Sequence, residues 1–365
     1  DCKKENNMKK LKFAVIGAGS GGQGMAAKLA IDGYSVKLYD IDDEKIRKLK
    51  EIGEIKLSGK IVGIGRPDVI TTDIREAVEG VDVIMVITTT NAHADVAVSL
   101  MPYLKDEQMV ILNPGHTGGV LEFKNVLKQN NSVSTPIIAE TQDLLYGCRT
   151  NSIGDIFVSG IKKVMGIATL PAKDVNYVIE TLGSIFPQFK ALPNVLYTSL
   201  DNMASIIHPI PTLLNINKID LMQSFEYYME GITPSIANIM EQADKERLDI
   251  GRAFGITLTS ISEWLKTSYG LKDGSLYEIL QSNEAYRGTK SPQSINHRFL
   301  YEDTLSGMVP LASLGAELGI KTPTLNAFIC IASIVSDRNY YKEGRTVEKL
   351  GLAGKTVEEI CEMVS

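Results

Sequence analysis

A glycine-rich turn directly after a short apolar stretch is the feature that most constrains this chain. Residues 12–16 read Lys-Phe-Ala-Val-Ile, and a G-x-G-x-x-G pattern follows with Gly17, Gly19 and Gly22. A helical pattern over residues 25–31 comes next. A strand that runs through such a turn into a helix predicts the first unit of a doubly wound α/β sheet that binds a dinucleotide.

Each glycine of the turn has its own physical reason. Gly17 permits the tight turn, Gly19 lets the backbone approach a pyrophosphate, and Gly22 lets the helix pack against the strand. The helix that follows points its free N–H groups and positive dipole at the phosphates. The expected pyrophosphate-binding loop comprises Gly17, Ala18, Gly19, Ser20, Gly21 and Gly22. The alternative is a glycine turn in another kind of α/β protein.

An acidic residue closes the second predicted strand, which covers residues 35–39. Asp40 stands 18 residues after Gly22, where a carboxylate can accept hydrogen bonds from the adenosine ribose and repel a 2′-phosphate. NAD(H) is therefore the preferred cofactor, with NADP(H) as the second choice. The competing interpretation makes Asp40 a turn residue at a strand end.

The remaining pattern indicates two domains. Further apolar strands are expected over residues 82–88, 109–112 and 136–139, with helices between them, which is typical of a mainly parallel sheet. Two more strand-like stretches, 156–161 and 164–170, either pair as a hairpin or extend the sheet. After residue 195 helical patterns dominate, at 199–208, 233–253, 260–269 and 324–337. We expect a tail over 1–8, an NAD-binding Rossmann domain over 9–193 and an all-helical domain over 194–365.

Composition excludes several classes of protein. The net charge of −6 over 365 residues gives no basic surface for nucleic acid or an anionic membrane, and the apolar runs are too short to span a bilayer. The first eight residues are polar, unlike a secretory signal, and the four cysteines form no metal-binding pattern. We expect a cytoplasmic protein without a metal site.

Histidines are the natural proton donors near neutral pH, and the chain has four. His93 follows an apolar strand and either approaches a nicotinamide or lies in a surface loop. His116 lies in a glycine-rich loop, and His297 has the surroundings of a structural or exposed residue. His208 stands before Pro209 among apolar residues, so it is either a core histidine or a catalytic one aimed into a cleft.

A charged cluster near residue 300 is equally ambiguous. Arg298, Glu302 and Asp303 fall within two helical turns. One interpretation is a local ion pair of Arg298 with Glu302 on a solvated helix. The other is an arginine that clamps a carboxylate, together with a buried acid that orients a histidine.

Several motifs, taken together and in this order, resemble the opine dehydrogenases of the octopine and nopaline type. These are Gly17 to Gly22, Asn113-Pro114-Gly115, Glu140-Thr141, Cys148-Arg149, His208-Pro209 and Arg298 to Asp303. The resemblance runs from Leu11 to about Leu352 and is strongest to members that use apolar L-amino acids. It implies a Rossmann domain followed by a helical domain.

The resemblance also implies the reaction. Opine dehydrogenases join an α-keto acid to the amine of an L-amino acid and reduce the imine with a nicotinamide cofactor. It assigns His208 and Asp303 as the catalytic pair and Arg298 as the group that binds the keto acid carboxylate. It also implies pyruvate and an apolar L-amino acid. Separately from the resemblance, we expect a homodimer.

Three residues have weaker assignments. Thr141 binds keto acid or cofactor, Asn113 contacts the cofactor, and Tyr286 binds substrate or only packs. His116 and His297 match no requirement of the family and are left out of the catalytic set.

Two other functions compete with this one. A hydroxyacid or glycerol-phosphate dehydrogenase would share the Rossmann and helical domains, but these enzymes usually rely on a catalytic lysine, and no lysine here lies in a convincing motif. A non-catalytic NAD(H)-binding sensor would tolerate the loss of His208 and Asp303, and their joint presence argues against it.

Overall fold

The computed structural model describes residues 10–365, so the tail expected over 1–8 lies outside the described residues. The chain forms two compact units. Unit 1 runs to Pro114 and adds residues 126–170 and 174–191, while unit 2 comprises residues 115–125, 171–173 and 192–365. The chain thus passes between the units several times, whereas the sequence suggested one passage near residue 193.

The main sheet of unit 1 has eight strands in the order β12-β11-β8-β7-β6-β1-β2-β5. All neighbouring strands pair in parallel except β11, which runs antiparallel to β8. The doubly wound, mainly parallel sheet is therefore confirmed. The strands are β1 (Lys12–Ile16), β2 (Ser35–Tyr39), β5 (Val69–Thr71), β6 (Val83–Val86), β7 (Met109–Leu112), β8 (Ile137–Thr141), β11 (Met165–Leu170) and β12 (Phe189–Ala191).

A second sheet, in the order β4-β3-β10-β9, was not expected from the sequence. Its strands are β3 (Ile55–Gly59), β4 (Gly63–Gly65), β9 (Tyr146–Ser152) and β10 (Asp155–Ile161). Neither stretch proposed as a late hairpin pairs with the other. β10 pairs with β9 in this sheet, while β11 extends the main sheet.

Helix α1 (Ser20–Ile31) packs against both sheets. It contacts β1 and β2 of the main sheet and all four strands of the second sheet. A helix covered on two sides buries residues all round, which explains why its sequence is apolar or small almost throughout. Close approach is built in, since a Cβ at Gly24 would lie 2.7 Å from the Cys148 sulfur.

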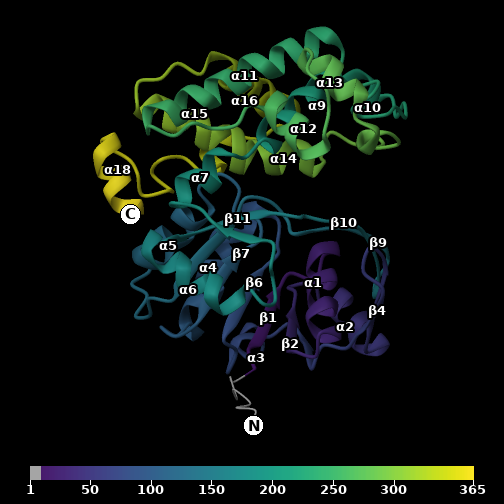
Figure 1. Ribbon diagram of the computed structural model, residues 1–365, viewed down its shortest axis with the longest axis vertical. Helices are drawn as coiled ribbons and strands as arrows, with labels where there is room; N and C mark the ends of the chain where they lie inside the picture. Colours follow the sequence, from purple (N-terminus) through teal and green to yellow (C-terminus); the bar gives the residue numbers. More distant parts are fainter. Residues whose placement is uncertain (1–9) are drawn as a thin grey trace, which may run out of the picture. The chain divides into compact units, whose positions relative to one another are not determined.

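The other helices of the chain complete unit 1 and form most of unit 2 (Figure 1). Unit 1 holds α2 (Asp43–Ile52), α3 (Ile74–Val78), α4 (His93–Leu100) and α6 (Val175–Leu182). Helix α5 (Gly119–Gln129) is divided, with residues 119–125 assigned to unit 2 and the rest to unit 1. Unit 2 holds α7 (Val195–Leu200), α8 (Ala204–Ile207), α9 (Pro209–Leu214), α10 (Ile216–Asp220), α11 (Pro234–Ala253), α12 (Ile261–Tyr269), α13 (Leu276–Ser282), α14 (Arg298–Asp303), α15 (Val309–Glu317), α16 (Pro323–Ser336), α17 (Tyr340–Glu343) and α18 (Val357–Val364).

The helix expected over 199–208 is wrong in its bounds. The chain forms α7 and α8 with a break between them, and a new helix, α9, starts at Pro209. Proline suits a first helical position because its missing N–H would be unpaired there anyway. His208 therefore stands at the junction of two short helices.

Buried charges organise the interior of unit 2. Arg247 on α11 is completely buried, binds Asp244, and donates to the carbonyls of Leu200 and Thr259. Glu246 accepts the first N–H groups of α16. Asp244 Oδ2 accepts from the Ile261 N–H at the start of α12. Together these bonds tie α7, α12 and α16 to the long helix α11, which Figure 1 shows extending along unit 2. No helix within residues 10–365 has both the length and the apolar character needed to cross a membrane.

The turn from β1 to α1 depends on one close contact. A Cβ at Gly22 would lie 1.7 Å from the Gly17 carbonyl oxygen, whereas a Cβ at Gly19 would meet nothing within 4 Å. We therefore expect Gly22→Ala to lower the free energy of unfolding by about 3 kcal/mol or more, the upper range for overpacking. Gly19→Ala is the matched control and should change it by less than about 1 kcal/mol. Urea unfolding followed by circular dichroism measures both, and equal midpoints would contradict this account of the turn.

Candidate active site

The glycine loop of unit 1 is held by the carboxylate that follows β2. Asp40 Oδ2 accepts from the Ala18 N–H at 2.6 Å and from Lys45 Nζ at 3.1 Å, while Oδ1 accepts from the Asp42 N–H at 3.0 Å. Asp40 therefore shapes the loop as well as standing where a ribose would lie in a dinucleotide fold. The pattern placed it correctly at the strand end, but did not reveal these backbone contacts.

The loop fits a pyrophosphate. Helix α1 begins at Ser20, so the first N–H groups of its turn have no partner inside the helix. The space above Gly19 is open, and Gly17 has a φ of +102°, a conformation that favours glycine. Ser20 Oγ lies 2.7 Å from Thr150 Oγ1 of β9, which fixes the start of the helix.

Two further predicted residues end neighbouring strands of the same sheet. Asn113 follows β7 and is completely buried. Its Oδ1 accepts from the Leu145 N–H, while its Nδ2 makes no hydrogen bond with the described residues. A buried amide nitrogen without a partner is suited to a polar ligand atom. Thr141, the last residue of β8, uses its hydroxyl to donate to the Asp143 carbonyl at 2.9 Å, so only its acceptor capacity remains.

His208 and Asp303 come together in unit 2, 95 residues apart in the chain. His208 Nδ1 lies 2.8 Å from Asp303 Oδ2. Tyr227 and Thr212 both donate side-chain hydrogen bonds to the His208 carbonyl, which fixes the backbone at the α8–α9 junction. An ionised carboxylate only accepts, so Nδ1 carries the proton and Nε2 of the neutral ring is an acceptor.

Aromatic side chains that the sequence analysis missed surround His208. Phe299 of α14 stacks on the imidazole with ring centroids 4.1 Å apart, and the Tyr228 hydroxyl lies 3.3 Å from Nε2. The predicted Tyr286 stacks on Tyr228 at 4.1 Å and so stands one ring away from His208. Only the tyrosine pair at 227–228 and the phenylalanine beside Arg298 offered a signal in the sequence.

Burial and charge set the protonation of this cluster. Burial raises the pKa of Asp303, but the charge and hydrogen bond of His208, followed by the charges of His116 and Arg298, outweigh it and hold the pKa below its ordinary 3.8. Burial, with the nearby Tyr269 and Asp303, raises the pKa of Tyr228. At neutral pH Asp303 is therefore ionised and the Tyr228 hydroxyl can donate to Nε2.

Arg298 begins α14 and combines both interpretations of its cluster. Its Nε lies 3.4 Å from Glu302 Oε2, one turn along the helix. The Arg298 side chain is 56% exposed, while Glu302 is buried. The ion pair is thus present, and the exposed guanidinium keeps donors for an incoming carboxylate.

The other histidines fall into three different settings. His93 is fully buried at the start of α4, so its interpretation as a surface residue is wrong. His297 accepts the Phe299 N–H and caps α14, in keeping with a structural role. His116 is buried with Nδ1 3.8 Å from Asp303 Oδ1, a proximity that the sequence analysis did not predict.

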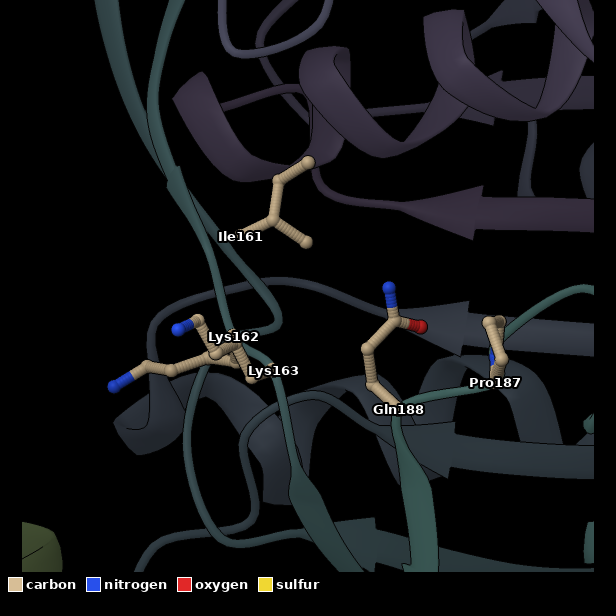
Figure 2. Close-up of a pocket in the computed structure, with 5 residues that line it drawn as sticks. All are labelled: Ile161, Lys162, Lys163, Pro187 and Gln188. Atoms are coloured by element: carbon tan, nitrogen blue, oxygen red, sulfur yellow. The ribbon is translucent and has the colours of Figure 1, made fainter. Parts of the chain in front are cut away.

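A surface hollow of unit 1 contains none of these residues. Ile161, Lys162, Lys163, Pro187 and Gln188 line it. Figure 2 shows the ammonium groups of Lys162 and Lys163 directed to one side, away from the Gln188 amide. The hollow therefore adds no residue to the candidate site.

Known families match both units. The family described as "NAD/NADP octopine/nopaline dehydrogenase, alpha-helical domain" matches residues 191–336. The family described as "NAD binding domain of 6-phosphogluconate dehydrogenase" matches residues 12–116.

Individual proteins match nearly the whole chain. An opine dehydrogenase from Arthrobacter sp. (strain 1C) is 41% identical over 349 residues, which cover 95% of this chain and 97% of that protein. A solved octopine dehydrogenase structure with NADH and L-arginine has a TM-score of 0.80 at 20% identity, covering 96% of this chain and 97% of that one. A second, with NADH and pyruvate, has a TM-score of 0.78 at 20% identity, covering 95% and 98%. At such identity the two structures show the shared fold.

The lowered pKa of Asp303 predicts a pH-dependent stability. Because the folded pKa lies below 3.8, ionised Asp303 stabilises the fold above that pH, and this contribution is lost as the pH falls through the folded value. Asp303→Asn should therefore be less stable than the wild type by about 1–3 kcal/mol at pH 7. The difference should shrink toward pH 3. Urea unfolding at several pH values measures it, and a difference that stays constant with pH would contradict this protonation state.

Proposed function

The chain belongs to the opine dehydrogenase family, and from this premise we propose that it condenses pyruvate with the amine of an apolar L-amino acid and reduces the imine with NADH. The product is a secondary amine that carries two carboxylates. The observation that carries the proposal is the His208–Asp303 pair, because its geometry supplies a proton donor and acceptor with a fixed tautomer.

His208 is the acid–base residue of this proposal. Its Nε2 faces the Tyr228 hydroxyl, and a substrate oxygen or nitrogen would take the place of that partner. His208 protonates the carbonyl-derived oxygen as water leaves, and in the reverse direction it accepts the proton. Asp303 holds Nδ1 and stabilises the imidazolium. Stacking on Phe299 keeps the ring in one plane through both states.

The remaining predicted residues bind and orient. Arg298 binds the keto acid carboxylate through its exposed guanidinium donors. Tyr286 contacts the amino acid from its stacked position on Tyr228, and apolar contact with these rings favours an apolar side chain. Thr141 offers its hydroxyl oxygen as an acceptor to substrate or cofactor.

The cofactor site of the proposal is the glycine loop. Gly17, Ala18, Gly19, Ser20, Gly21 and Gly22 hold the pyrophosphate, Asp40 the adenosine ribose, and Asn113 Nδ2 a polar atom of the cofactor. When bound, NADH supplies the hydride that reduces the imine carbon. We prefer NAD(H) because Asp40 places a negative charge where NADP(H) would carry its 2′-phosphate.

We also propose a cytoplasmic homodimer. Cys148, Cys330 and Cys361 are free thiols, as expected in a reducing compartment. Helix α16 exposes Ile331 and Ile334 along one side, and this apolar strip is the surface that we expect a second copy to cover. Sedimentation of the wild type and of Ile334→Glu tests this, since the variant should be monomeric.

The reaction is tested by following NADH absorbance with pyruvate and a panel of single L-amino acids, and by identifying products by mass. We expect oxidation only when both substrates are present, fastest with apolar amino acids. His208→Ala should lower kcat by about a hundredfold or more, the usual contribution of a general acid–base.

NADH binding by His208→Ala is the control for this experiment. His208→Ala should bind NADH as the wild type does, because the glycine loop belongs to unit 1. Near-wild-type turnover in the variant would remove His208 from the chemistry. Oxidation of NADH with pyruvate alone, giving a hydroxy acid, would favour a hydroxyacid dehydrogenase instead.

Cofactor choice gives a separate prediction for Asp40. Asp40→Ser removes the charge that opposes a 2′-phosphate, so the ratio of kcat/KM for NADPH to that for NADH should rise about tenfold or more. Asp43→Ser is the matched control, because Asp43 is an exposed acid three residues away, in the first turn of α2. An unchanged ratio in Asp40→Ser would reject its ribose role.

A further inference from the structure

The second oxygen of Asp303 has a histidine of its own. Oδ2 binds His208, whereas Oδ1 is buried and makes no hydrogen bond to any residue from 10 to 365. His116 Nδ1 lies 3.8 Å from Oδ1, too far for a hydrogen bond but within range of an ion pair. Asp303 thus lies between two imidazoles, of which the proposed mechanism uses one.

The backbone at His116 is held in an unusual conformation. Its φ is +55°, in the left-handed region that side chains other than glycine seldom adopt. Such a conformation persists only where the surroundings enforce it, and it often accompanies a functional site. The contacts of Gly115 and Thr117 therefore show what holds His116 in this conformation.

Arg345 forms hydrogen bonds with the backbone on both sides of His116. Its Nη1 donates to the Gly115 carbonyl at 2.9 Å and to the Thr117 carbonyl at 3.2 Å. Its Nε donates to Glu122 Oε2 at 2.6 Å, and both Arg345 and Glu122 are buried. A planar guanidinium with donors in fixed directions can make all three bonds at once, which a lysine cannot.

The segment after Asp303 also binds Arg345 and the loop that contains His116. Residues Thr304–Met308 form a π-helical turn, labelled η5. Helix α15 then begins at Val309 and has a proline at its second position, Pro310. Pro310 has no N–H for the carbonyls of the preceding turn. The Leu305 carbonyl accepts from the Arg345 N–H at 3.0 Å, and the Ser306 carbonyl from the Thr117 N–H at 3.1 Å.

From this arrangement we infer that His116 is a positioning residue, which holds the Asp303 carboxylate against His208, and that Arg345 holds His116 in place. The inference rests on the proposed roles of His208 and Asp303. A buried carboxylate balances one imidazolium, and two would leave an uncompensated buried charge. His116 is therefore neutral while His208 carries the transferred proton. Its Nδ1–H, 3.8 Å from Oδ1, attracts that oxygen electrostatically, so that Oδ2 stays directed at Nδ1 of His208.

The backbone conformation dictates the variants. Glycine and asparagine both accept a φ near +55°, so neither His116→Gly nor His116→Asn strains the loop. The amide nitrogen of asparagine is as many bonds from the backbone as Nδ1 of histidine and can donate to Oδ1. Glycine provides no donor. Comparing the two variants separates the effect of the His116 side chain on turnover from any effect of its backbone conformation.

We expect His116→Gly to lower kcat about tenfold, the scale of coupling between contacting groups. The KM values for both substrates should change less than threefold, because His116 acts through Asp303. His116→Asn should recover kcat to within about threefold of the wild type. Arg345→Lys should reproduce the kinetics of His116→Gly, and the two changes together should cost no more than either alone. The His116 pair decides the question even if Arg345→Lys does not fold.

A double-mutant cycle with Asp303→Asn completes the test, with slow turnover measured as product mass over hours. If His116 acts through Asp303, His116→Gly should lower kcat less than twofold in that background. An undiminished tenfold loss there, or no rescue by asparagine, would overturn the inference. NADH titration and thermal unfolding confirm that each variant is folded. Near-wild-type turnover in His208→Ala would reject the proposed function itself, which is a different outcome from a silent His116→Gly.

Discussion

Asp303 is a carboxylate without access to water, and much of unit 2 can be understood from the cost of keeping it ionised. One oxygen is stabilised by His208, and the charges of His116 and Arg298 act on the same group. Phe299 closes the face of the imidazole, so the pair is shielded as well as matched in charge. Because the ionised Asp303 only accepts hydrogen bonds, the contact that stabilises its charge also fixes the proton of His208 on Nδ1.

The local signals in the sequence identified much of unit 1. The apolar strand, the glycine turn and the acid after β2 lie within 30 residues, so their relation depends on short-range rules that a pattern expresses well. The second sheet escaped notice because its strands come from two distant stretches, residues 55–65 and 146–161, which pair through β3 and β10. The glycine turn also hid a reciprocal contact, since Asp40 binds the Ala18 N–H and helps to shape the loop it was expected to serve.

The His208–Asp303 pair shows the limit of such rules. His208 and Asp303 are 95 residues apart, and no periodicity relates them, so only a family resemblance paired them in advance. His116 was set aside on the same resemblance, and the fold brought it to the other oxygen of Asp303. A left-handed backbone and the carbonyls ahead of a proline are tertiary facts that residue types alone do not disclose.

The threading of the chain has a consequence for recombination. Residues 115–125 belong to the helical unit although they directly follow strand β7 of the other unit. A chimera joined once at residue 193 would take this segment from one parent and residues 194–365 from another. His116 would then come from a different parent than Asp303, and Glu122 from a different parent than Arg345. To exchange the helical unit between relatives, residues 115–125 must therefore be exchanged together with residues 192–365. The unit is encoded by separate parts of the gene.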